Sequence, residues 1–313
     1  MAESQVDLEG ARTLDEGLPR IADAHDRMAD PEAWLEGHGW DADRWGGWPT
    51  ASDLERVAPG RRAAFWAHDH HSYWVSVAAL AAGGVTAATA DPPGGVIRRL
   101  PDGGPSGVLH EAAARLVSLI VPLPTTDELV GAIPPLARRL LALGVVSVHD
   151  PGTLIPDPDL ARAHPAYRRL SDAGELPVRV HACLRPESLA TALARGLRSG
   201  APRGEDTAGR AVSGWQKLFA DGTLGARTAR LLAPVELPPG EEPPPGGMRG
   251  VWMTDPAELS AYATRAAEAG IATQIHAIGD EAVRVSLEIL APTARRTPFA
   301  PRLEHVQRRL VEL

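Results

Sequence analysis

A lysine and two histidines lie near the ends of three short apolar segments in the second half of the chain. Lys217 lies in residues 212–219, His276 ends residues 271–276, and His305 lies in residues 302–307. Imidazole nitrogens bind Zn²⁺ well, and histidines from separate strands can hold one ion together. The spacing therefore predicts a metal centre built from residues that are distant in the sequence.

Lys217 is the only lysine in 313 residues, although lysine and arginine together number 32. Arginine stays protonated in proteins, whereas a buried ammonium can lose its proton and become a nucleophile or a modifiable amine. The alternative is a surface lysine whose amine reaches solvent. Because arginine fills that role elsewhere in this chain, we expect Lys217 to perform chemistry that a guanidinium cannot.

The second half of the chain alternates short apolar strands with amphipathic helices. Strands are predicted at 144–150, 176–184, 212–219, 271–276 and 302–307, and helices at 126–143, 165–174, 186–197, 255–269 and 280–290. This alternation indicates an α/β fold with a parallel sheet, either a barrel or a doubly wound sheet. In a barrel, the carboxyl ends of the strands meet at one mouth, which would bring Lys217, His276 and His305 together.

The first third of the chain has a different character. Residues 34–48 are rich in Trp and Gly, and residues 85–109 carry turn signals between short β-prone runs, which predicts loops and hairpins rather than helices. We therefore expect two parts: residues 1–124, with a β-hairpin-rich insertion, and residues 125–313, with a partial (β/α) barrel. The Pro- and Gly-rich residues 231–250 are expected to form a lid or a disordered connection.

Composition excludes several classes of partner. The net charge of −8 argues against nucleic-acid binding, and no run of 18 apolar residues predicts a membrane span. The N-terminus lacks the basic and apolar regions of a secretory signal. Cys183 is the only cysteine, which rules out an intrachain disulfide and favours a cytoplasmic location. A homo-oligomer is compatible with these features.

A set of motifs along most of the chain resembles the amidohydrolase superfamily, in the branch that includes N-substituted formamide deformylases. In the first half, the motifs are Gly39-Trp40-Asp41 with Trp45 and Pro49, Asp69-His70-His71-Ser72 with Trp74, the turn from Asp91 to Gly95, Gly107 to Glu111, and Gly144 to Asp150. In the second half, they are Lys217 to Gly222 with Gly225 and Arg227, His276 to Asp280, and Arg302 to His305 with Gln307.

The resemblance implies a metal-dependent-hydrolase fold, a (β/α)8 TIM-type barrel, with one or two divalent ions that we expect to be zinc. Lys217 matches the family lysine that can carry a CO₂-derived carbamate, and His276 and His305 match metal ligands of the next two strands. By the same resemblance these three residues are catalytic. The metal would lower the pKa of water, and the hydroxide so formed would attack the carbonyl of a small-molecule amide.

The chain also departs from the family pattern. The His-x-His that ends the first barrel strand and the Asp that ends the eighth have no match, so the barrel is expected to be incomplete, without strand 1 and strands 7 and 8. The nearest candidate for the first motif, Asp23-Ala24-His25, lies in a charged stretch, and His25 is interpreted as a surface residue.

Four further residues are expected to contact substrate: Asp69, His71, Asp221 and Arg227. Glu111 is a weaker candidate. His68 and His70 have His-x-His spacing, but the family placement of this segment favours a substrate-side insertion over a metal site. Trp40, Trp66 and Trp74 are expected to pack in the core, and His149 and His181 to be hydrogen-bonded structural histidines.

The leading hypothesis is a metal-dependent hydrolase of non-peptide C–N bonds in amides or formamides. One alternative is a catalytically inactive fragment of such an enzyme with a structural role or none. The other alternative keeps the barrel but changes the reaction to that of a lactonase or a deaminase.

Overall fold

The computed structural model divides the chain into two compact units. It describes residues 5–152, 157, 159–202, 209–237, 243 and 246–307. The N-terminal unit comprises residues 2–122 and 221–253, and the parallel-sheet unit comprises residues 123–220 and 254–313. The division predicted at 124/125 assigns residues 221–253 to the second part, whereas in the structure these residues are grouped with the first.

Five parallel strands form the sheet of the parallel-sheet unit. They lie in the order β11-β10-β9-β8-β7, which places strands in sequence order side by side. Their bounds are β7 (Ser147–Asp150), β8 (Arg179–Leu184), β9 (Ala211–Phe219), β10 (Thr273–Ala277) and β11 (Arg302–His305). The α/β prediction with a parallel sheet is confirmed, and each of the five strands overlaps its predicted range.

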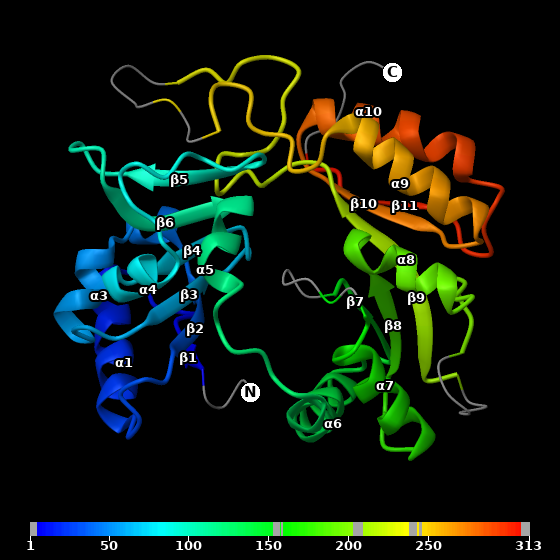
Figure 1. Cartoon of the computed structure of the whole chain (residues 1–313), viewed down its shortest axis with the longest axis horizontal. Coiled ribbons are helices and arrows are strands. Elements are labelled where there is room, and N and C mark those ends of the chain that lie inside the picture. The colour runs from blue at the N-terminus through cyan, green and yellow to red at the C-terminus, as the bar shows by residue number, and fades with distance from the viewer. Residues whose placement is uncertain are drawn as a thin grey trace. The chain divides into compact units, whose positions relative to one another are not determined.

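Helices connect these strands and cover the sheet. They are α6 (Thr126–Ala142), α7 (Ala163–Asp172), α8 (Leu189–Ala194), α9 (Pro256–Glu268) and α10 (Asp280–Leu290), with short 3₁₀ turns at Pro186–Ser188 and Ala291–Thr293. Helices α9 and α10 lie together on one face of β9, β10 and β11 (Figure 1). Leu218 and Ile275 are in register on neighbouring strands and are buried, while Lys217 and His276 project to the opposite face by strand alternation.

The N-terminal unit contains a six-stranded mixed sheet in the order β1-β2-β3-β4-β6-β5. Its strands are β1 (Val6–Asp7), β2 (Leu35–Trp40), β3 (Ala63–Ala67), β4 (Ser72–Val75), β5 (Gly95–Arg99) and β6 (Pro105–Glu111). Strands β1, β2 and β3 are parallel, and the remaining pairs are antiparallel. The hairpin predicted within residues 85–109 corresponds to β5 and β6.

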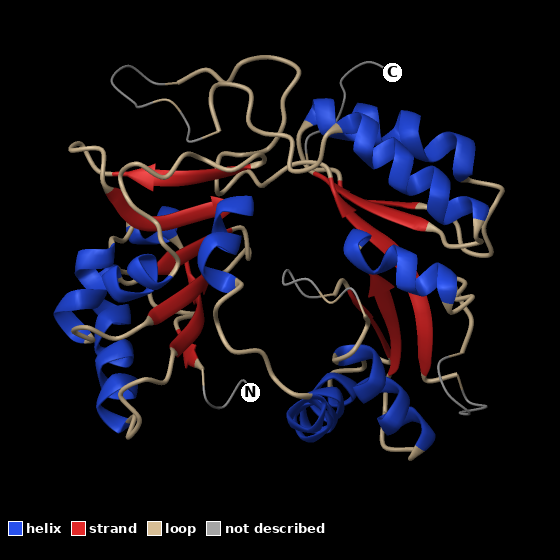
Figure 2. Ribbon diagram, viewed as in Figure 1, coloured by secondary structure: helices blue, strands red, loops and turns tan. Residues whose placement is uncertain are grey.

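Helices also build this unit, so the prediction of an irregular, non-helical first third is wrong. They are α1 (Leu14–Arg27), α2 (Ala42–Trp45), α3 (Ala51–Val57), α4 (Val77–Ala82) and α5 (Arg115–Ser118), with a 3₁₀ turn at Ala112–Ala114. Helices α1 and α3 contact each other and lie on the same side of the sheet (Figure 2).

Helix α1 was not predicted, although Leu14, Leu18 and Ile21 recur on one helical face. Only Leu18 and Ile21 supply large buried side chains, and Pro19 lies inside the helix. The helix is instead fixed at its start, where Thr13 Oγ1 accepts a hydrogen bond from the Glu16 amide at 3.2 Å. His25 lies on this helix, partly buried, and its Nδ1 accepts a hydrogen bond from Arg61 Nε at 3.3 Å.

Trp40, Trp66 and Trp74 were predicted to pack in the core; Trp40 and Trp74 do so, and Trp66 packs against it partly buried. Trp40 and Trp74 are fully buried, with ring centroids 6.2 Å apart, and each indole N–H donates to a backbone carbonyl. Trp66 stacks on Tyr73 at 4.2 Å. Buried tryptophan needs such a partner for its N–H, and here the backbone supplies it.

Residues 231–250, predicted as a lid or disordered connection, lie partly outside the described residues. In the described part, the Leu231 amide donates to the Arg249 carbonyl, and the Val235 amide donates to the Met248 carbonyl. Within the residues that the structure describes, no helix combines the length and the apolar character needed to cross a membrane.

Candidate functional site

Three adjacent strands of the parallel-sheet unit carry the predicted metal-binding residues. Lys217 lies two residues before the end of β9, His276 lies one residue before the end of β10, and His305 ends β11. The rings of His276 and His305 are 4.5 Å apart at an angle of 63°. The structure therefore brings the three residues to the carboxyl edge of one sheet.

Strand register alone would have separated the two histidines. His276 pairs with Glu304, and His305 pairs with Ala277, so regular alternation puts His305 on the opposite face from His276. His305 instead has a φ of 74°, in the left-handed region that non-glycine residues seldom adopt. The strand ends at this residue, and the two imidazoles lie in contact. Sparsely populated backbone conformations of this kind cluster at functional sites.

Lys217 is buried, and its amine forms an ion pair with the carboxylate of Glu304. Its Nζ also lies 4.4 Å from the centre of the Phe219 ring. Burial lowers the pKa of Lys217, an effect that the Glu304 carboxylate opposes without cancelling. The amine is therefore less firmly protonated than that of a surface lysine.

The chemistry of these donors fits a divalent metal. His276 and His305 offer imidazole nitrogens that suit Zn²⁺, and Glu304 is paired with His276 in the strand register while its carboxylate is bound to Lys217. Gln274 pairs with Lys217 in the sheet, and its side-chain Oε1 is buried with no hydrogen-bond partner among the described residues. Over the same described ranges, no three His, Cys, Asp or Glu side chains are grouped to hold a metal.

His149 and His181 belong to a second group of rings in the same unit. Their ring centroids are 4.5 Å apart, and His149 stacks on Trp215 at 4.8 Å. Arg302 Nη1 donates a hydrogen bond to His149 Nδ1 at 2.6 Å. Burial is the main cause of the lowered pKa of both histidines, and it brings the pKa of His181 to about 4. Both imidazoles are therefore neutral at pH 7.

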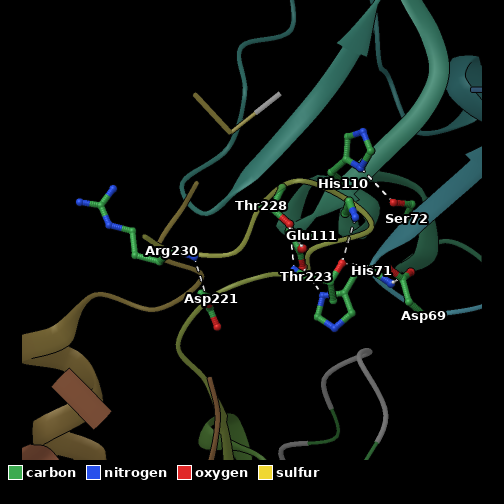
Figure 3. Close-up of polar contacts among 10 residues, drawn as sticks. Asp69, His71, Ser72, His110, Glu111, Asp221, Thr223, Thr228 and Arg230 are labelled. Atoms are coloured by element: carbon green, nitrogen blue, oxygen red, sulfur yellow. Dashed lines mark hydrogen bonds and ion pairs between the residues drawn. The ribbon is translucent and has the colours of Figure 1, made fainter. Parts of the chain in front are cut away.

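A separate polar cluster forms within the N-terminal unit, centred on Glu111 at the end of β6. His71 Nδ1 lies 2.7 Å from Glu111 Oε2, and Thr228 Oγ1 donates to Glu111 Oε1 at 2.6 Å. Figure 3 shows Glu111 between these two partners. The side chains of Glu111 and His71 are 1% and 11% exposed, so this is a nearly buried ion pair.

Asp69 joins the same cluster from the turn between β3 and β4. Its Oδ1 accepts from the His71 amide at 3.0 Å, and its Oδ2 accepts from Thr223 Oγ1 at 2.9 Å. The intervening residue, His70, has a φ of 60°. Both oxygens of Asp69 are therefore engaged within the protein, which makes this carboxylate a support of the turn.

His71, in the turn before β4, and His110, on β6, have opposite protonation preferences. Burial lowers the pKa of His71, but the charge and hydrogen bond of Glu111 outweigh it, and the net pKa is raised. His110 donates to or accepts from Ser72 Oγ at 2.9 Å, and burial with nearby Arg98 lowers its pKa to about 3. Glu111 thus favours the protonated form of His71, whereas His110 is a neutral imidazole at neutral pH.

The two other predicted substrate contacts differ in exposure. Asp221 is fully buried, and its Oδ2 accepts a hydrogen bond from the Arg230 amide at 2.8 Å. Arg227 is exposed and has a φ of 57°. Asp221 lies close enough to His71 to favour the protonated imidazole, so the structure groups Asp69, His71 and Asp221 in one unit.

Sequence reasoning missed three participants in these clusters and underrated a fourth. Glu304 precedes a conspicuous histidine, and strand alternation in known register would have placed it beside Lys217. Thr223 and Thr228 carried no signal, because hydroxyl partners of buried carboxylates are recognisable only in three dimensions. Glu111 was ranked low, although it ends a strand of otherwise apolar character.

Comparison with known proteins places these observations in context. The sequence profile described as "Amidohydrolase family" matches residues 1–308. The chain is 29% identical to Protein LONG AFTER FAR-RED 3 of Arabidopsis thaliana and 28% identical to the putative amidohydrolase YtcJ of Bacillus subtilis. Each alignment covers 97% of the chain, but only 52% and 54% of those proteins. The chain thus spans about half the length of these curated relatives.

The chain is also similar to a formamide deformylase over a shorter length and to a metal-dependent hydrolase of known structure. The N-substituted formamide deformylase of Arthrobacter pascens is 31% identical over 171 residues, which are 53% of this chain and 30% of that protein. The crystal structure of an uncharacterized metal-dependent hydrolase from Pyrococcus horikoshii OT3 superposes with a TM-score of 0.60 and 26% identity. That superposition covers 97% of this chain and 55% of the other.

Proposed function

Because the chain belongs to the amidohydrolase family, we propose that it provides the metal-binding strands of a hydrolase that cleaves non-peptide C–N bonds of amides or formamides. One observation carries the proposal: Lys217, His276 and His305 lie at the carboxyl ends of three adjacent parallel strands. The similarity to a solved metal-dependent hydrolase supports the metal, and that to a formamide deformylase supports the class of bond.

His276 and His305 would hold the metal through their imidazole nitrogens, and Lys217 would complete the set after CO₂ converts its amine into a carbamate. We take zinc as the metal, because the donors are nitrogen and oxygen. When bound, the metal supplies a polarised carbonyl and a water of lowered pKa.

The surroundings of Lys217 suit carbamate formation, which requires a neutral amine. Phe219 lies against both His276, at 5.2 Å, and the Lys217 amine, so the lysine is held away from water. Glu304 is positioned to accept the proton that Lys217 Nζ releases. Burial favours this proton transfer, because in a low-dielectric setting a neutral amine and a carboxylic acid cost less free energy to bury than an ammonium and a carboxylate.

The proposal is tested by zinc content and turnover of the purified chain. After reconstitution with zinc and bicarbonate, we expect hydrolysis of N-substituted formamides, and not of lactones or amino-substituted nitrogen heterocycles, in a common panel. Lys217→Ala should abolish turnover and lower the zinc content. A preference for lactones or heterocyclic amines would replace the C–N hydrolase by a lactonase or a deaminase.

A non-catalytic role is the second candidate, and the Lys217–Glu304 ion pair favours it. The pair satisfies the amine within the protein, so the fold of this unit needs no metal at that position. This candidate predicts that the purified chain holds no stoichiometric zinc and that Lys217→Ala destabilises the fold instead of removing an activity. Calorimetric unfolding with and without added zinc separates the two candidates.

A further inference from the structure

Arg302 has no part in the metal chemistry proposed above, and its contacts are unusual for an exposed arginine. The chain has 40 Asp and Glu against 32 Lys and Arg, yet no carboxylate of the described residues forms an ion pair with Arg302. Its guanidinium instead lies 4.6 Å from the centre of the Trp215 ring, and its Nη1 donates a hydrogen bond to His149 Nδ1 at 2.6 Å. Both partners are uncharged at pH 7, so the positive charge has no counter-charge in contact with it.

Elements from both edges of the sheet hold this guanidinium in one orientation. Arg302 begins β11 and His149 lies in β7, the two outermost strands of the five-stranded sheet, so their hydrogen bond requires a curved sheet with these side chains on its concave face. Trp215 lies on the central strand β9. Its indole N–H donates to the Ala300 carbonyl at 2.8 Å, and its ring packs on His149 at 4.8 Å and on Phe299 at 4.5 Å. The fixed ring orients the guanidinium, and the remaining N–H groups of the fork are left to bind a ligand.

Trp215 reaches the concave face through a bulge in β9. Ala182 pairs with Ser213 and Leu184 pairs with Gln216, so two steps along β8 match three steps along β9. Without the extra residue, Trp215 would lie beside Leu184, on the face that packs against helices. Bulges that re-aim one side chain in this way are frequent beside active sites.

The charge of Arg302 acts on the neighbouring imidazoles. Burial is the main cause of the lowered pKa of His149, and Arg302 lowers it further while Glu304 opposes this effect. Burial also lowers the pKa of His181, and Arg179 and Arg302 are among the further causes that bring it to about 4. Since Glu304 is bound to Lys217, the charge left over on this part of the sheet is positive and favours a negatively charged ligand.

This charge lies within a small molecule's length of the proposed metal-binding lysine. Arg302 and Glu304 alternate onto the same face of β11, and Glu304 is bound to Lys217. Trp215, under the guanidinium, precedes Lys217 by two residues on β9, which is about 6.6 Å along the strand. A charge-assisted hydrogen bond takes up about 2.8 Å of that distance, so about one or two carbon atoms would join the anionic group to an amide beside Lys217.

We propose that Arg302, held by Trp215 and His149, binds a carboxylate of the substrate, so that the preferred amides carry a carboxylate about one or two carbon atoms from the amide group. The single positive charge of Arg302 matches a carboxylate better than a phosphate monoester, which carries about 1.5 to 2 negative charges at pH 7. The inference rests on the proposed function for the bond that is cleaved, and it adds a specificity-determining residue to that site.

Steady-state kinetics of the zinc-loaded full chain test the inference with N-formylglycine and its neutral analogue N-formylglycinamide. Loss of a charged hydrogen bond should lower kcat/KM for N-formylglycine by about 10- to 100-fold in Arg302→Gln. The value for N-formylglycinamide and the zinc content should stay unchanged, and Arg302→Lys should restore part of the preference because it keeps the charge without the planar fork. An unaltered preference for N-formylglycine in Arg302→Gln would overturn the assignment.

Arg179→Gln is the matched control. Arg179 is an exposed arginine on β8 that also lowers the pKa of His181, but in the part of the chain that the structure describes it stacks on no ring. This variant should keep the preference for N-formylglycine. An equal loss of preference in Arg179→Gln and Arg302→Gln would show a general effect of charge and contradict a binding site at Arg302.

NMR of the full chain with ¹⁵N-labelled histidine, purified without added zinc, gives a test that is independent of turnover. Because a bound carboxylate offsets the charge of Arg302, N-formylglycine should raise the pKa of His149, and N-formylglycinamide should not. In Arg302→Gln, N-formylglycine should no longer have this effect. If the chain hydrolyses no amide but the pKa of His149 rises as expected, the proposed function fails while the carboxylate site stands. If both amides are hydrolysed equally well and the pKa of His149 does not change, the carboxylate site alone fails.

Discussion

At the scale of single residues, substitutions of Lys217 test whether this residue acts as a cation, as in its ion pair with Glu304, or as a carbamate. Lys217→Arg retains the positive charge but cannot form a carbamate, so it places a fixed cation where an anionic ligand is required. We expect this variant to lose zinc and activity, and Lys217→Glu to retain more of both because a carboxylate is an oxygen ligand. Elemental analysis and turnover, with and without bicarbonate, check this. An active Arg variant would exclude the carbamate.

A second residue-scale prediction concerns acid stability. Burial with nearby Arg98 lowers the pKa of His110 to about 3 in the folded chain, against an unfolded value near 6.5. Between these values the unfolded chain binds a proton that the folded chain does not, so the contribution of His110 is full above pH 6.5 and is lost as pH falls. The stability difference between wild type and His110→Gln should change by about 1.4 kcal/mol per pH unit in that window. Urea unfolding at several pH values measures it, and parallel curves would contradict it.

Gly222 allows a third residue-scale prediction. A Cβ at this position would lie 2.0 Å from Thr228 Oγ1 and 2.1 Å from Glu111 Oε1, so these groups must move apart. Gly222→Ala should therefore destabilise the fold by about 1–3 kcal/mol. Gly47→Ala is the control, because a Cβ there meets nothing within 4 Å. Equal unfolding midpoints for the two variants would show that the cluster tolerates displacement.

Residue type and position were enough to select Lys217, His276 and His305, because unusual or metal-binding side chains followed apolar strands. They could not identify the partner of Lys217. Glu304 is separated from it by 87 residues, and only the register of three strands puts the two side chains on one face. The contact of His305 with His276 likewise depends on a backbone conformation that no sequence pattern encodes.

At the scale of secondary-structure elements, α6 combines a strong start signal with helix-disfavouring residues, Gly131, Pro134 and Pro135, inside it. Thr125 and Glu128 form a capping box at its start, and Gly131 lies in an open position of its first half. Thr125→Ala should destabilise the fold by about 1 kcal/mol through loss of the cap, and Gly131→Ala should stabilise it by about 0.5–1 kcal/mol. Thermal unfolding of the two variants should therefore shift in opposite directions. A common direction of change would indicate that α6 is governed by its packing instead.

The strength of the local sequence pattern explains which helices and strands could be predicted from the sequence. Residues 126–290 alternate strands and helices with a clear period, and each predicted element there has a counterpart. Helix α1 has an apolar face but many charged residues around it, and β1 is only two residues long. Both are stabilised by contacts with partners distant in sequence, such as the pairing of Val6 with Gly37, which local patterns do not contain.

At the scale of the whole molecule, residues 221–253 complete a unit that is otherwise formed by the first 122 residues. A fragment of residues 1–122 would leave Glu111 without Thr228 and Asp69 without Thr223. We expect this fragment to be less stable to urea than a version in which residues 221–253 are joined to it by a flexible linker. Replacing Thr223 and Thr228 by Val in the joined segment should remove much of the gain. Equal midpoints for all three proteins would contradict this.

This arrangement could not be inferred from sequence, because residues 221–253 look like an ordinary connection. Their Pro and Gly content predicts a loop, which is correct locally, but it carries no information on the partner of that loop. The partner is specified by buried hydrogen bonds of individual hydroxyl and carboxylate groups, such as that of Thr228 with Glu111.

The discontinuous path of the chain also constrains the order of folding. Strand β9 pairs with β10 only after residues 220–272 have been synthesised, and the N-terminal unit lacks its last segment until residue 253 has emerged. Closing such a long connection has an entropic cost that grows slowly with its length, but native contacts of high sequence separation slow folding markedly. Neither unit can therefore finish folding early on the ribosome. The partly buried carboxylate of Asp69 and the buried carboxylate of Glu111 stay incompletely hydrogen bonded until threonines more than one hundred residues later have been synthesised.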